Sequence, residues 1–379
     1  MEPAARVLPA GPRKLVFFSN TSWYLWNFRL RMAERLAASG HEVVFLAPPD
    51  DYSRRLAAAG RFLPVGLDRK GTNVVSEFVS LVDVFKALRR EKPCVLLSWT
   101  PKANIYGGLA CQALRIPYVP NIAGLGSSSS RADGLARAMP GLYRVSLRRA
   151  ATVFFQNGDD RDHLVGAGAV AGERAVQLPG SGVDLARFVP RPLPPREPFR
   201  FLYAGRLLGE KGVRELVAAV RLLRDASARP FELQVVGFID TGNPNAITDA
   251  ELAEWHDEGI VRFRGQSDRV EEELAAAHCV VHPSYYPEGR PRILLEAAAS
   301  GRAAITTDST GCRDAVHDQA TGLLVQPRDV QSLAAAMQRM LEMPWEELER
   351  MGAAARRLAE GEFSEDIVFA CYEKALGAL

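Results

Sequence analysis

Three features are absent from this sequence or scarce in it. It has no run of eighteen apolar residues, so no segment is predicted to span a membrane. The opening residues, MEPAARVLPAGPRK, lack the apolar core of a signal peptide, so we expect a chain that is not exported. The cysteines are few and lie far apart, which disfavours a cysteine-based metal site and favours free thiols: Cys94, Cys111, Cys279, Cys312 and Cys371.

The charge is unevenly distributed along the chain. The net charge is only +2, and a hydrophobic content of 47% with a charged content of 24% is typical of a soluble globular protein. However, residues 1–190 carry 25 Lys and Arg against 15 Asp and Glu, whereas residues 191–379 carry 22 against 30. A basic first half favours a polyanionic partner such as a membrane surface or a lipid diphosphate. We expect no nucleic-acid partner.

Strand and helix patterns alternate through the first half, which predicts a doubly wound α/β domain with a parallel sheet. Strands are expected at 14–18, 41–47, 62–65, 94–98, 118–121 and 152–156, and helices at 24–38, 75–90, 104–114 and 135–149. The first strand–helix turn is SNTSWYLWNF, without the glycines that a bound dinucleotide requires.

A proline-rich stretch at 180–197 predicts an interdomain linker, after which the alternation resumes. Strands are expected at 199–204, 232–236, 261–264, 279–282, 303–306 and 322–325, and helices at 213–223, 250–256, 270–276 and 291–299. Helices starting near Asp329, Pro344 and Ser364 complete the chain. We expect an N-terminal acceptor domain at 1–188, a C-terminal donor domain at 189–363, and a helix at 364–379 that packs back on the first domain.

The stretch 276–296 combines a strand, a loop and a helix start. Pro291 is predicted as the first helical residue, because its missing N–H would have no helix partner there. The free amides at such a helix start attract anions. Glu288 on the loop and Glu296 on the helix place carboxylates nearby, which suits a sugar nucleotide better than a bare phosphate.

Two cations follow the first strand of the second domain. Arg206 and Lys211 lie in AGRLLGEKG, at the sheet edge where the loop 284–290 is expected. Two cations and a helix start can bind a diphosphate through charge-assisted hydrogen bonds. Charges of an ordinary surface loop are the alternative.

Two segments of the first half are candidates for contact with an acceptor. Trp23, Trp26 and their aromatic neighbours form either a platform for a sugar or lipid, or a hydrophobic helix start packed on the sheet. The segment 124–149 interleaves apolar residues with arginines. It predicts a helix that contacts a membrane surface, although an ordinary surface helix has the same pattern.

Several motifs together resemble the family-4 glycosyltransferases of the GT-B fold. They are GRLLGEKG, VVGFIDTGNPNAIT, HPSYYPEGRPRILLEAAASGRAAITTDSTGCRDAV and TGLLV in the second half. In the first half SNTSWYLWNFRL, TPKANIYGG, NIAGLGS, FFQN and LPGSGVDLARF resemble the branch that acts on polyprenyl-diphosphate-linked saccharides. The resemblance implies two Rossmann-like domains facing a cleft.

The resemblance implies a role for each candidate residue of the donor site. Arg206 and Lys211 would hold the donor diphosphate, and Glu296 the ribose. Glu288, with the amides of Gly289 and Arg290, would contact the donor sugar. Glu288, Arg206 and Lys211 would be the catalytic residues, and candidates for acceptor binding are Asn20, Trp23, Trp26, Lys102, Asn121, Gly124 and Gly126.

The expected reaction is a retaining transfer of a hexose or N-acetylhexosamine from a UDP-sugar to a polyprenyl-diphosphate-linked saccharide, in bacterial surface-glycan or glycoprotein-glycan assembly. Relatives often have a histidine near residues 123–126, which is absent here, so Lys102 or Asn121 is expected to position the acceptor. We expect no cofactor and no metal. Asp160 and Asp162 resemble a metal motif of a different glycosyltransferase fold, but helix capping explains their position.

Other functions remain open. A GT-B transferase with a soluble acceptor and a GT-B sugar-nucleotide epimerase are both consistent with the motifs, and a non-catalytic sugar-nucleotide-binding protein is disfavoured by the intact set of cations and glutamates. The expected location is the cytoplasm, at the inner face of the cytoplasmic membrane. The sequence does not identify the donor sugar, the acceptor, the linkage or the oligomeric state.

Overall fold

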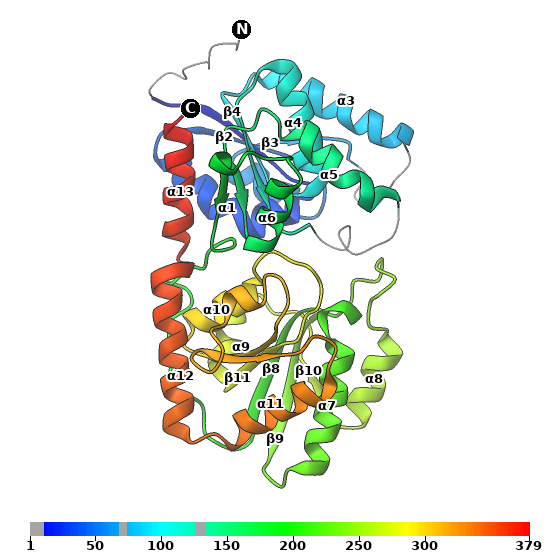
Figure 1. Cartoon of the computed structure of the whole chain (residues 1–379), viewed down its shortest axis with the longest axis vertical. Coiled ribbons are helices and arrows are strands. Elements are labelled where there is room, and N and C mark those ends of the chain that lie inside the picture. Colours follow the sequence, from blue (N-terminus) through cyan, green and yellow to red (C-terminus); the bar gives the residue numbers. More distant parts are fainter. Residues whose placement is uncertain (1–10, 68–73, 126–133) are drawn as a thin grey trace. The chain divides into compact units, whose positions relative to one another are not determined.

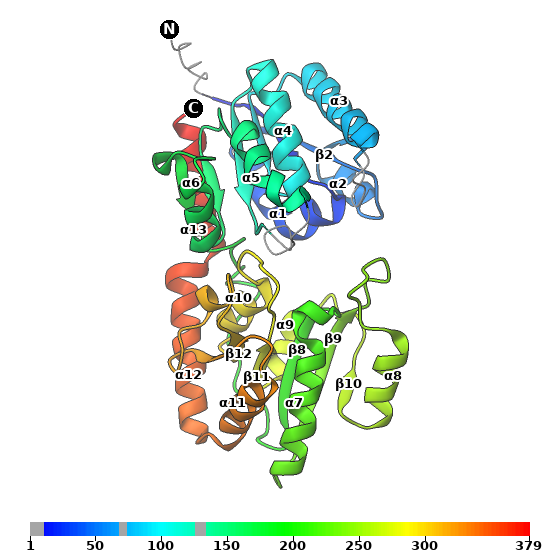
Figure 2. The same ribbon diagram turned by 45° about the vertical axis from the view of Figure 1, so that its right-hand side comes forward.

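The computed structural model describes residues 11–67, 74–125 and 134–379, and all statements below concern these residues (Figures 1 and 2). The chain divides into two units. Unit 1 comprises the residues up to Leu178 together with Phe369–Leu379, and unit 2 comprises Pro179–Val368. The two are described separately.

Unit 1 contains a seven-stranded parallel sheet in the order β3-β2-β1-β4-β5-β6-β7. Its strands are β1 (Lys14–Phe18), β2 (Glu42–Ala47), β3 (Arg61–Pro64), β4 (Val95–Ser98), β5 (Tyr118–Ile122), β6 (Val153–Phe155) and β7 (Ala175–Gln177). Because the strand order reverses between β1 and β4, the carboxyl ends of these strands form the edge where such sheets bind ligands. Asn20 follows β1, and Lys102 follows β4.

The helices of unit 1 connect successive strands. They are α1 (Ser22–Ala38), α2 (Ser53–Ala59), α3 (Val74–Glu91), α4 (Pro101–Leu114), α5 (Gly134–Ser146) and α6 (Gly158–Gly166), followed by a 3-10 turn at Gly172–Arg174. The sequence pattern did not predict α2 or β7. Helix α2 has one buried apolar residue, Leu56, so it leaves almost no periodic signal. No helix of the described residues is both long and apolar enough to cross a membrane.

Unit 2 repeats this architecture with six parallel strands in the order β10-β9-β8-β11-β12-β13. They are β8 (Phe199–Arg206), β9 (Phe231–Phe238), β10 (Val261–Phe263), β11 (Cys279–His282), β12 (Ala303–Thr307) and β13 (Gly322–Val325). Its helices are α7 (Val213–Ala226), α8 (Asp249–Asp257), α9 (Val270–Ala276), α10 (Arg292–Ala299), α11 (Val330–Glu342) and α12 (Trp345–Leu358). The order reverses between β8 and β11, so the loops after these strands meet.

Helices cover both faces of the second sheet. Successive strand residues point to opposite faces, and Tyr203 of β8 belongs to the core under α7 and α11, whereas its neighbour Leu202 belongs to the core under α10 and α12. Two buried layers on one sheet define a doubly wound fold in unit 2. Parallel strands connected by helices occur in both units, so the predicted α/β class is confirmed for both halves of the chain.

The proline-rich stretch lies within unit 2, where the sequence predicts an interdomain linker and a boundary at residue 188. The buried guanidinium of Arg302 donates to the carbonyls of Arg191 (2.8 Å) and Pro192 (3.2 Å). In addition, Val183 N donates to Phe363 O at 2.8 Å. These bonds fasten a segment without regular structure to the sheet domain, and proline content alone cannot reveal them.

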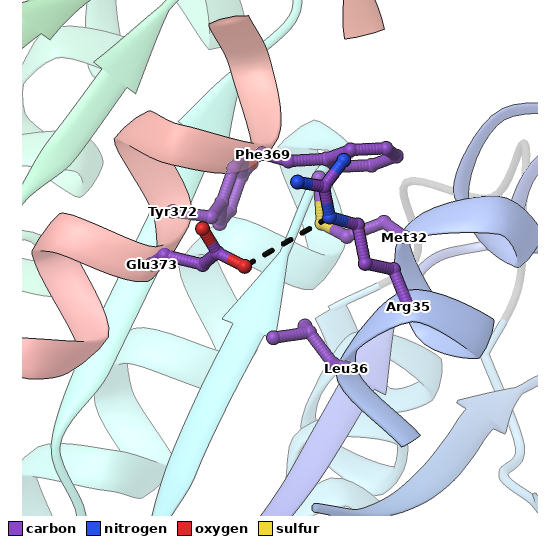
Figure 3. Close-up of a pocket in the computed structure, with 6 residues that line it drawn as sticks. All are labelled: Met32, Arg35, Leu36, Phe369, Tyr372 and Glu373. Atoms are coloured by element: carbon purple, nitrogen blue, oxygen red, sulfur yellow. Dashed lines mark ion pairs between the residues drawn. The ribbon is translucent and has the colours of Figure 1, made fainter. Parts of the chain in front are cut away.

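The last helix, α13 (Glu365–Gly377), reaches unit 1, where its residues from Phe369 onward pack on α1 (Figure 3). The Tyr372 hydroxyl accepts hydrogen bonds from Trp99 Nε1 (2.9 Å) and Asn121 Nδ2 (3.0 Å). A small pocket between the helices is lined by Met32, Arg35, Leu36, Phe369, Tyr372 and Glu373. It contains none of the predicted site residues, so it is not a candidate active site.

Candidate active site

The loops after β8 and β11 are joined at the carboxyl edge of unit 2. Tyr285 N donates to Glu210 O at 3.1 Å, which ties the loop carrying Glu288 to the turn carrying Lys211. Gly212 has φ +74°, and a Cβ there would lie 2.1 Å from the Pro283 carbonyl oxygen. This close backbone approach requires glycine, so the final residue of GRLLGEKG is explained by packing of one loop on the other.

Lys211 and Glu288 form a largely buried ion pair, with Nζ 2.5 Å from Oε2. The other carboxylate oxygen, Oε1, lies 3.3 Å from His282 Nε2. Burial alone would raise the pKa of Glu288, but the Lys211 charge and the His282 hydrogen bond outweigh it and hold this pKa well below its usual range. Glu288 is therefore ionised at neutral pH.

Arg206 has a different partner. It ends β8, and its Nη1 lies 3.5 Å from the Asp240 carboxylate in the loop between β9 and α8. The structure therefore brings Lys211, but not the Arg206 side chain, into an ion pair with Glu288. The sequence indicated nothing about Asp240, because the loop that carries it has no periodic pattern.

Helix α10 begins one residue later than predicted. Pro291 precedes it with an extended ψ of 121°, so it is the N-cap and not the first helical residue. Arg292 pairs with Glu296, the Nε–Oε1 distance being 2.7 Å. Burial raises the pKa of Glu296, and the Arg292 charge offsets this only in part. Glu296 is thus a buried carboxyl group on the first turns of α10.

The loop after β12 packs against the loop that carries Glu288. Gly311 has φ +79°, and a Cβ at this position would lie 1.5 Å from Gly289 O and 2.6 Å from Glu288 O. Ser309 Oγ donates to Ser284 O at 3.0 Å, and Thr307 Oγ1 donates to the same carbonyl. The peptide between Glu288 and Gly289 is therefore held by direct backbone packing.

Arg290 follows this peptide and is largely enclosed. Its guanidinium lies 5.2 Å from the centre of the Phe363 ring. Burial lowers the pKa of Arg290, and Asp314 and Glu362 act in the opposite direction. Its side chain thus packs on the body of unit 2, and donor binding by its backbone amide stays a prediction.

His282, Glu288 and Cys312 bring three potential metal-ligating atoms within 4.8 Å of one another. Burial raises the pKa of the Cys312 thiol to about 11, so the sulfur is protonated and a poor ligand. The Lys211 ammonium already neutralises Glu288. This chemistry does not favour a cation, and we do not assign a metal site to it. Sequence reasoning missed His282, since it looks like the last residue of a buried strand.

The predicted acceptor residues of unit 1 lie in several environments. Lys102 Nζ is 2.6 Å from Glu77 Oε1, and Asn20 N donates to Thr100 Oγ1 at 3.0 Å. Asn121 is buried, and its amide nitrogen donates to Tyr372.

The remaining acceptor candidates are dispersed. Trp23 N donates to Asp50 Oδ2 at 2.9 Å, and the Trp26 ring lies 5.8 Å from the Arg55 guanidinium. Gly124 has φ +120°, and Gly126 lies outside the described residues. The structure therefore leaves acceptor binding by this set as a prediction.

The acidic residues of α6 serve the local structure. Asn157 is the N-cap and accepts from Asp160 N at 2.7 Å. Asp160 Oδ2 in turn accepts from Asn157 Nδ2 (2.8 Å) and Leu125 N (3.2 Å). Asp160 therefore stabilises the helix start and the preceding loop, and the capping interpretation agrees with these contacts.

Two family models cover most of the chain. Residues 25–181 match a glycosyl transferase 4-like domain, and residues 187–358 match glycosyl transferases group 1. The chain is 25% identical over 350 residues to the N,N'-diacetylbacillosaminyl-diphospho-undecaprenol α-1,3-N-acetylgalactosaminyltransferase of Campylobacter jejuni, with 87% of this chain and 89% of that protein covered.

A second relative and a solved structure are also similar to this chain. The UDP-Gal:α-D-GlcNAc-diphosphoundecaprenol α-1,3-galactosyltransferase of Escherichia coli is 21% identical, over 72% of this chain and 73% of its own. Anabaena HepE in complex with UDP and glucose superimposes with a TM-score of 0.79 at 18% identity, covering 97% of this chain and 100% of the other. The chain therefore belongs to the family-4 type of GT-B glycosyltransferases.

Proposed function

We propose that this enzyme transfers a hexose or N-acetylhexosamine from a UDP-sugar to a saccharide carried on polyprenyl diphosphate. The Lys211–Glu288 pair carries the donor part of the proposal, because it places a buried cation and an ionised carboxylate at the carboxyl edge of unit 2. A solved neighbour of the same fold binds UDP and glucose. Two relatives act, by name, on saccharides linked to diphosphoundecaprenol.

The donor would use the residues around this edge. Lys211 and Arg206 would bind the diphosphate. The Lys211 ammonium would then interact with both Glu288 and the diphosphate, and the Arg206 side chain would turn away from Asp240. Glu296 would accept hydrogen bonds from the ribose. Glu288 and the amides that follow it would bind the sugar hydroxyls.

The proposed chemistry proceeds with retention of configuration. The acceptor hydroxyl oxygen forms a bond to the anomeric carbon, while the bond from this carbon to the diphosphate oxygen breaks. The acceptor proton passes to the departing diphosphate on the same face of the sugar, and UDP leaves. The protein's main contribution would be to stabilise charge on UDP, and the loss of one such contact costs about a hundredfold or more in rate.

We further propose that unit 1 docks on an anionic membrane at the cytoplasmic face. Helix α5 exposes Leu142 and Val145 beside Arg144, and Arg148 and Arg149 follow it on the surface. Helix α3 adds a row of exposed apolar residues, Val75, Phe78 and Val79. Apolar side chains flanked by arginines suit an interface with anionic lipid.

One experiment tests the transfer. Wild-type enzyme is incubated with a polyprenyl-diphosphate saccharide and, in turn, UDP-GalNAc, UDP-GlcNAc, UDP-Gal and UDP-Glc, and UDP release is measured. We expect one donor to be used. Lys211→Ala should lose turnover, whereas Arg221→Ala is the control, since Arg221 pairs with Glu258 at the surface. The proposal is refuted if none of the four donors gives UDP release, or if Lys211→Ala is fully active.

Membrane docking is tested by sedimentation with vesicles that contain anionic lipid. Binding should fall as salt is raised, because salt screens the attraction. Replacing Arg144 and Arg148 with Glu should abolish it, and replacing Arg221 and Arg224 of α7 should not. Equal binding by both variants would contradict docking through α5.

A further inference from the structure

The imidazole of His282 is fixed in place by its surroundings. His282 is the last residue of β11, and its carbonyl accepts a hydrogen bond from Thr306 Oγ1 at 2.7 Å. Its ring stacks on Tyr203, with centroids 6.2 Å apart and an interplanar angle of 16°. The Tyr203 hydroxyl donates to Arg206 O at 2.7 Å, so this ring is itself anchored. His282 is only 4% exposed and has little freedom to turn.

The polar contact made by this imidazole is directed at Glu288. Nε2 lies 3.3 Å from Glu288 Oε1, whereas the buried Nδ1 has no hydrogen-bond partner among the described residues. An ionised carboxylate can only accept, so Nε2 carries the proton and donates. Leaving Nδ1 without a partner has a free-energy cost. The hydrogen bond from Nε2–H to Glu288 is therefore the polar interaction that the imidazole of His282 makes.

Lys211 has two competing tasks in the proposed function. In the structure its ammonium lies 2.5 Å from Glu288 Oε2, yet a bound donor would draw it toward the diphosphate. Glu288 would then lose part of the interaction that fixes one of its oxygens. The hydrogen bond from His282 to the other oxygen does not depend on the diphosphate.

We propose that His282 is a positioning residue, whose Nε2–H holds the Glu288 carboxylate toward the donor sugar while Lys211 is shared with the diphosphate. The inference rests on the proposed function for its consequence in catalysis. The hydrogen bond itself does not depend on the proposed function, and it can be tested in the ligand-free protein.

Among the described residues, titratable groups from several elements face the Glu288 carboxylate. They are Lys211 from the turn after β8, His282 from β11, Tyr203 from β8 and Cys312 from the loop after β12. Burial raises the pKa of Tyr203 and raises that of Cys312 to about 11, so neither of these two ionises in acid. If a substitution of His282 shifts the acid titration at this site, the shift therefore reports on the Glu288 carboxyl group.

The first measurement follows the Glu288 carboxyl carbon by NMR in ligand-free protein, with Glu288→Gln to assign the signal. In the wild type we expect the group to stay ionised well below its ordinary pKa of 4.5. In His282→Leu the midpoint should rise by about one unit or more, because a hydrogen bond to the charged form is lost. His282→Gln, which offers an amide N–H, should bring it back toward the wild type.

The second measurement separates binding from turnover. For His282→Leu we expect kcat with the UDP-sugar to fall about tenfold or more, with the Kd of UDP alone within about twofold of the wild type. His282→Gln should recover much of kcat, and thermal unfolding of all variants shows whether they are folded.

The outcomes are distinguishable. The inference is overturned if His282→Leu leaves the Glu288 midpoint and kcat unchanged. It is also overturned if kcat falls with an unchanged midpoint and without rescue by His282→Gln, which would indicate a purely structural role. If the wild type uses no UDP-sugar, the proposed function and the catalytic consequence both fail, and the carboxyl titration still decides whether His282 holds Glu288.

Discussion

The guanidinium of Arg206 lies 3.5 Å from the carboxylate of Asp240, in the loop between β9 and α8. The arginine proposed to bind a diphosphate is thus already engaged by an anion of the same unit. Asp240 competes with the ligand for this cation, and its removal should favour the ligand.

Asp240→Asn is therefore expected to tighten UDP binding. Partly exposed ion pairs contribute about 0–1 kcal/mol, so the Kd should fall by no more than about fivefold. Isothermal titration calorimetry measures this, with Asp257→Asn on α8 as a control of equal charge change. Weaker binding by Asp240→Asn would mean that Asp240 contacts the nucleotide directly.

Lys211→Met should destabilise unit 2 as well as stop turnover. The substitution leaves Glu288 enclosed without its ammonium partner, and breaking a buried ion pair costs about 3 kcal/mol or more. Denaturant unfolding should show this loss. The double variant Lys211→Met, Glu288→Gln should recover most of the stability but none of the turnover. If the double variant is no more stable than Lys211→Met alone, the pair does not account for the loss.

Gly311→Ala should disrupt the donor site. A Cβ at this position would meet the Gly289 carbonyl at 1.5 Å, and the backbone φ of +79° is unfavourable for alanine. The Glu288–Gly289 peptide must then move, so we expect kcat/KM for the UDP-sugar to fall about a hundredfold. Gly361→Ala is the control, because nothing lies within 4 Å of its added Cβ. Equal activity of both variants would exclude this packing as a determinant of the site.

His278 should make unit 2 less stable in mild acid. Burial lowers its folded-state pKa from 6.5 to about 4, with hydrogen bonds to proline carbonyls acting the other way. Between these two pH values the unfolded chain binds the proton and the folded chain does not. Stability is therefore lost as pH falls from 6.5 to 4, by on the order of 3 kcal/mol.

Thermal or denaturant unfolding across this range measures the effect. His278→Asn lowers stability at neutral pH, because Nδ1 accepts from Arg200 N at 2.8 Å, but it should remove this part of the pH dependence. A slope between pH 6.5 and 4 that is the same with and without His278 would assign the acid sensitivity to other groups.

The elements that carry the site could be predicted from the sequence because their patterns are local. Apolar strands at 199–204 and 279–282, each followed by a loop and a helix, place Lys211 and Glu288 at one sheet edge. The contacts within that edge could not be predicted. The Arg206–Asp240 pair joins two loops without periodicity, and His282 is indistinguishable in sequence from an ordinary buried strand residue.

Other details could not be predicted from composition. Prolines at 190–198 predict a linker, but they do not reveal that carbonyls of this segment are bound by Arg302, which lies more than a hundred residues later in the chain. The sequence predicts Pro291 inside the helix because proline is favoured at the first helical position, whereas the structure makes Pro291 the N-cap. Composition identified the irregular proline-rich segment but not its tertiary partner.

A structure of the enzyme with bound UDP tests the central claim most directly. We expect the diphosphate within hydrogen-bonding distance of the Lys211 ammonium, with Arg206 turned from Asp240 toward it and the ribose hydroxyls on Glu296. UDP bound at any other place, or bound with Lys211 still paired only with Glu288 and Arg206 only with Asp240, would contradict the account.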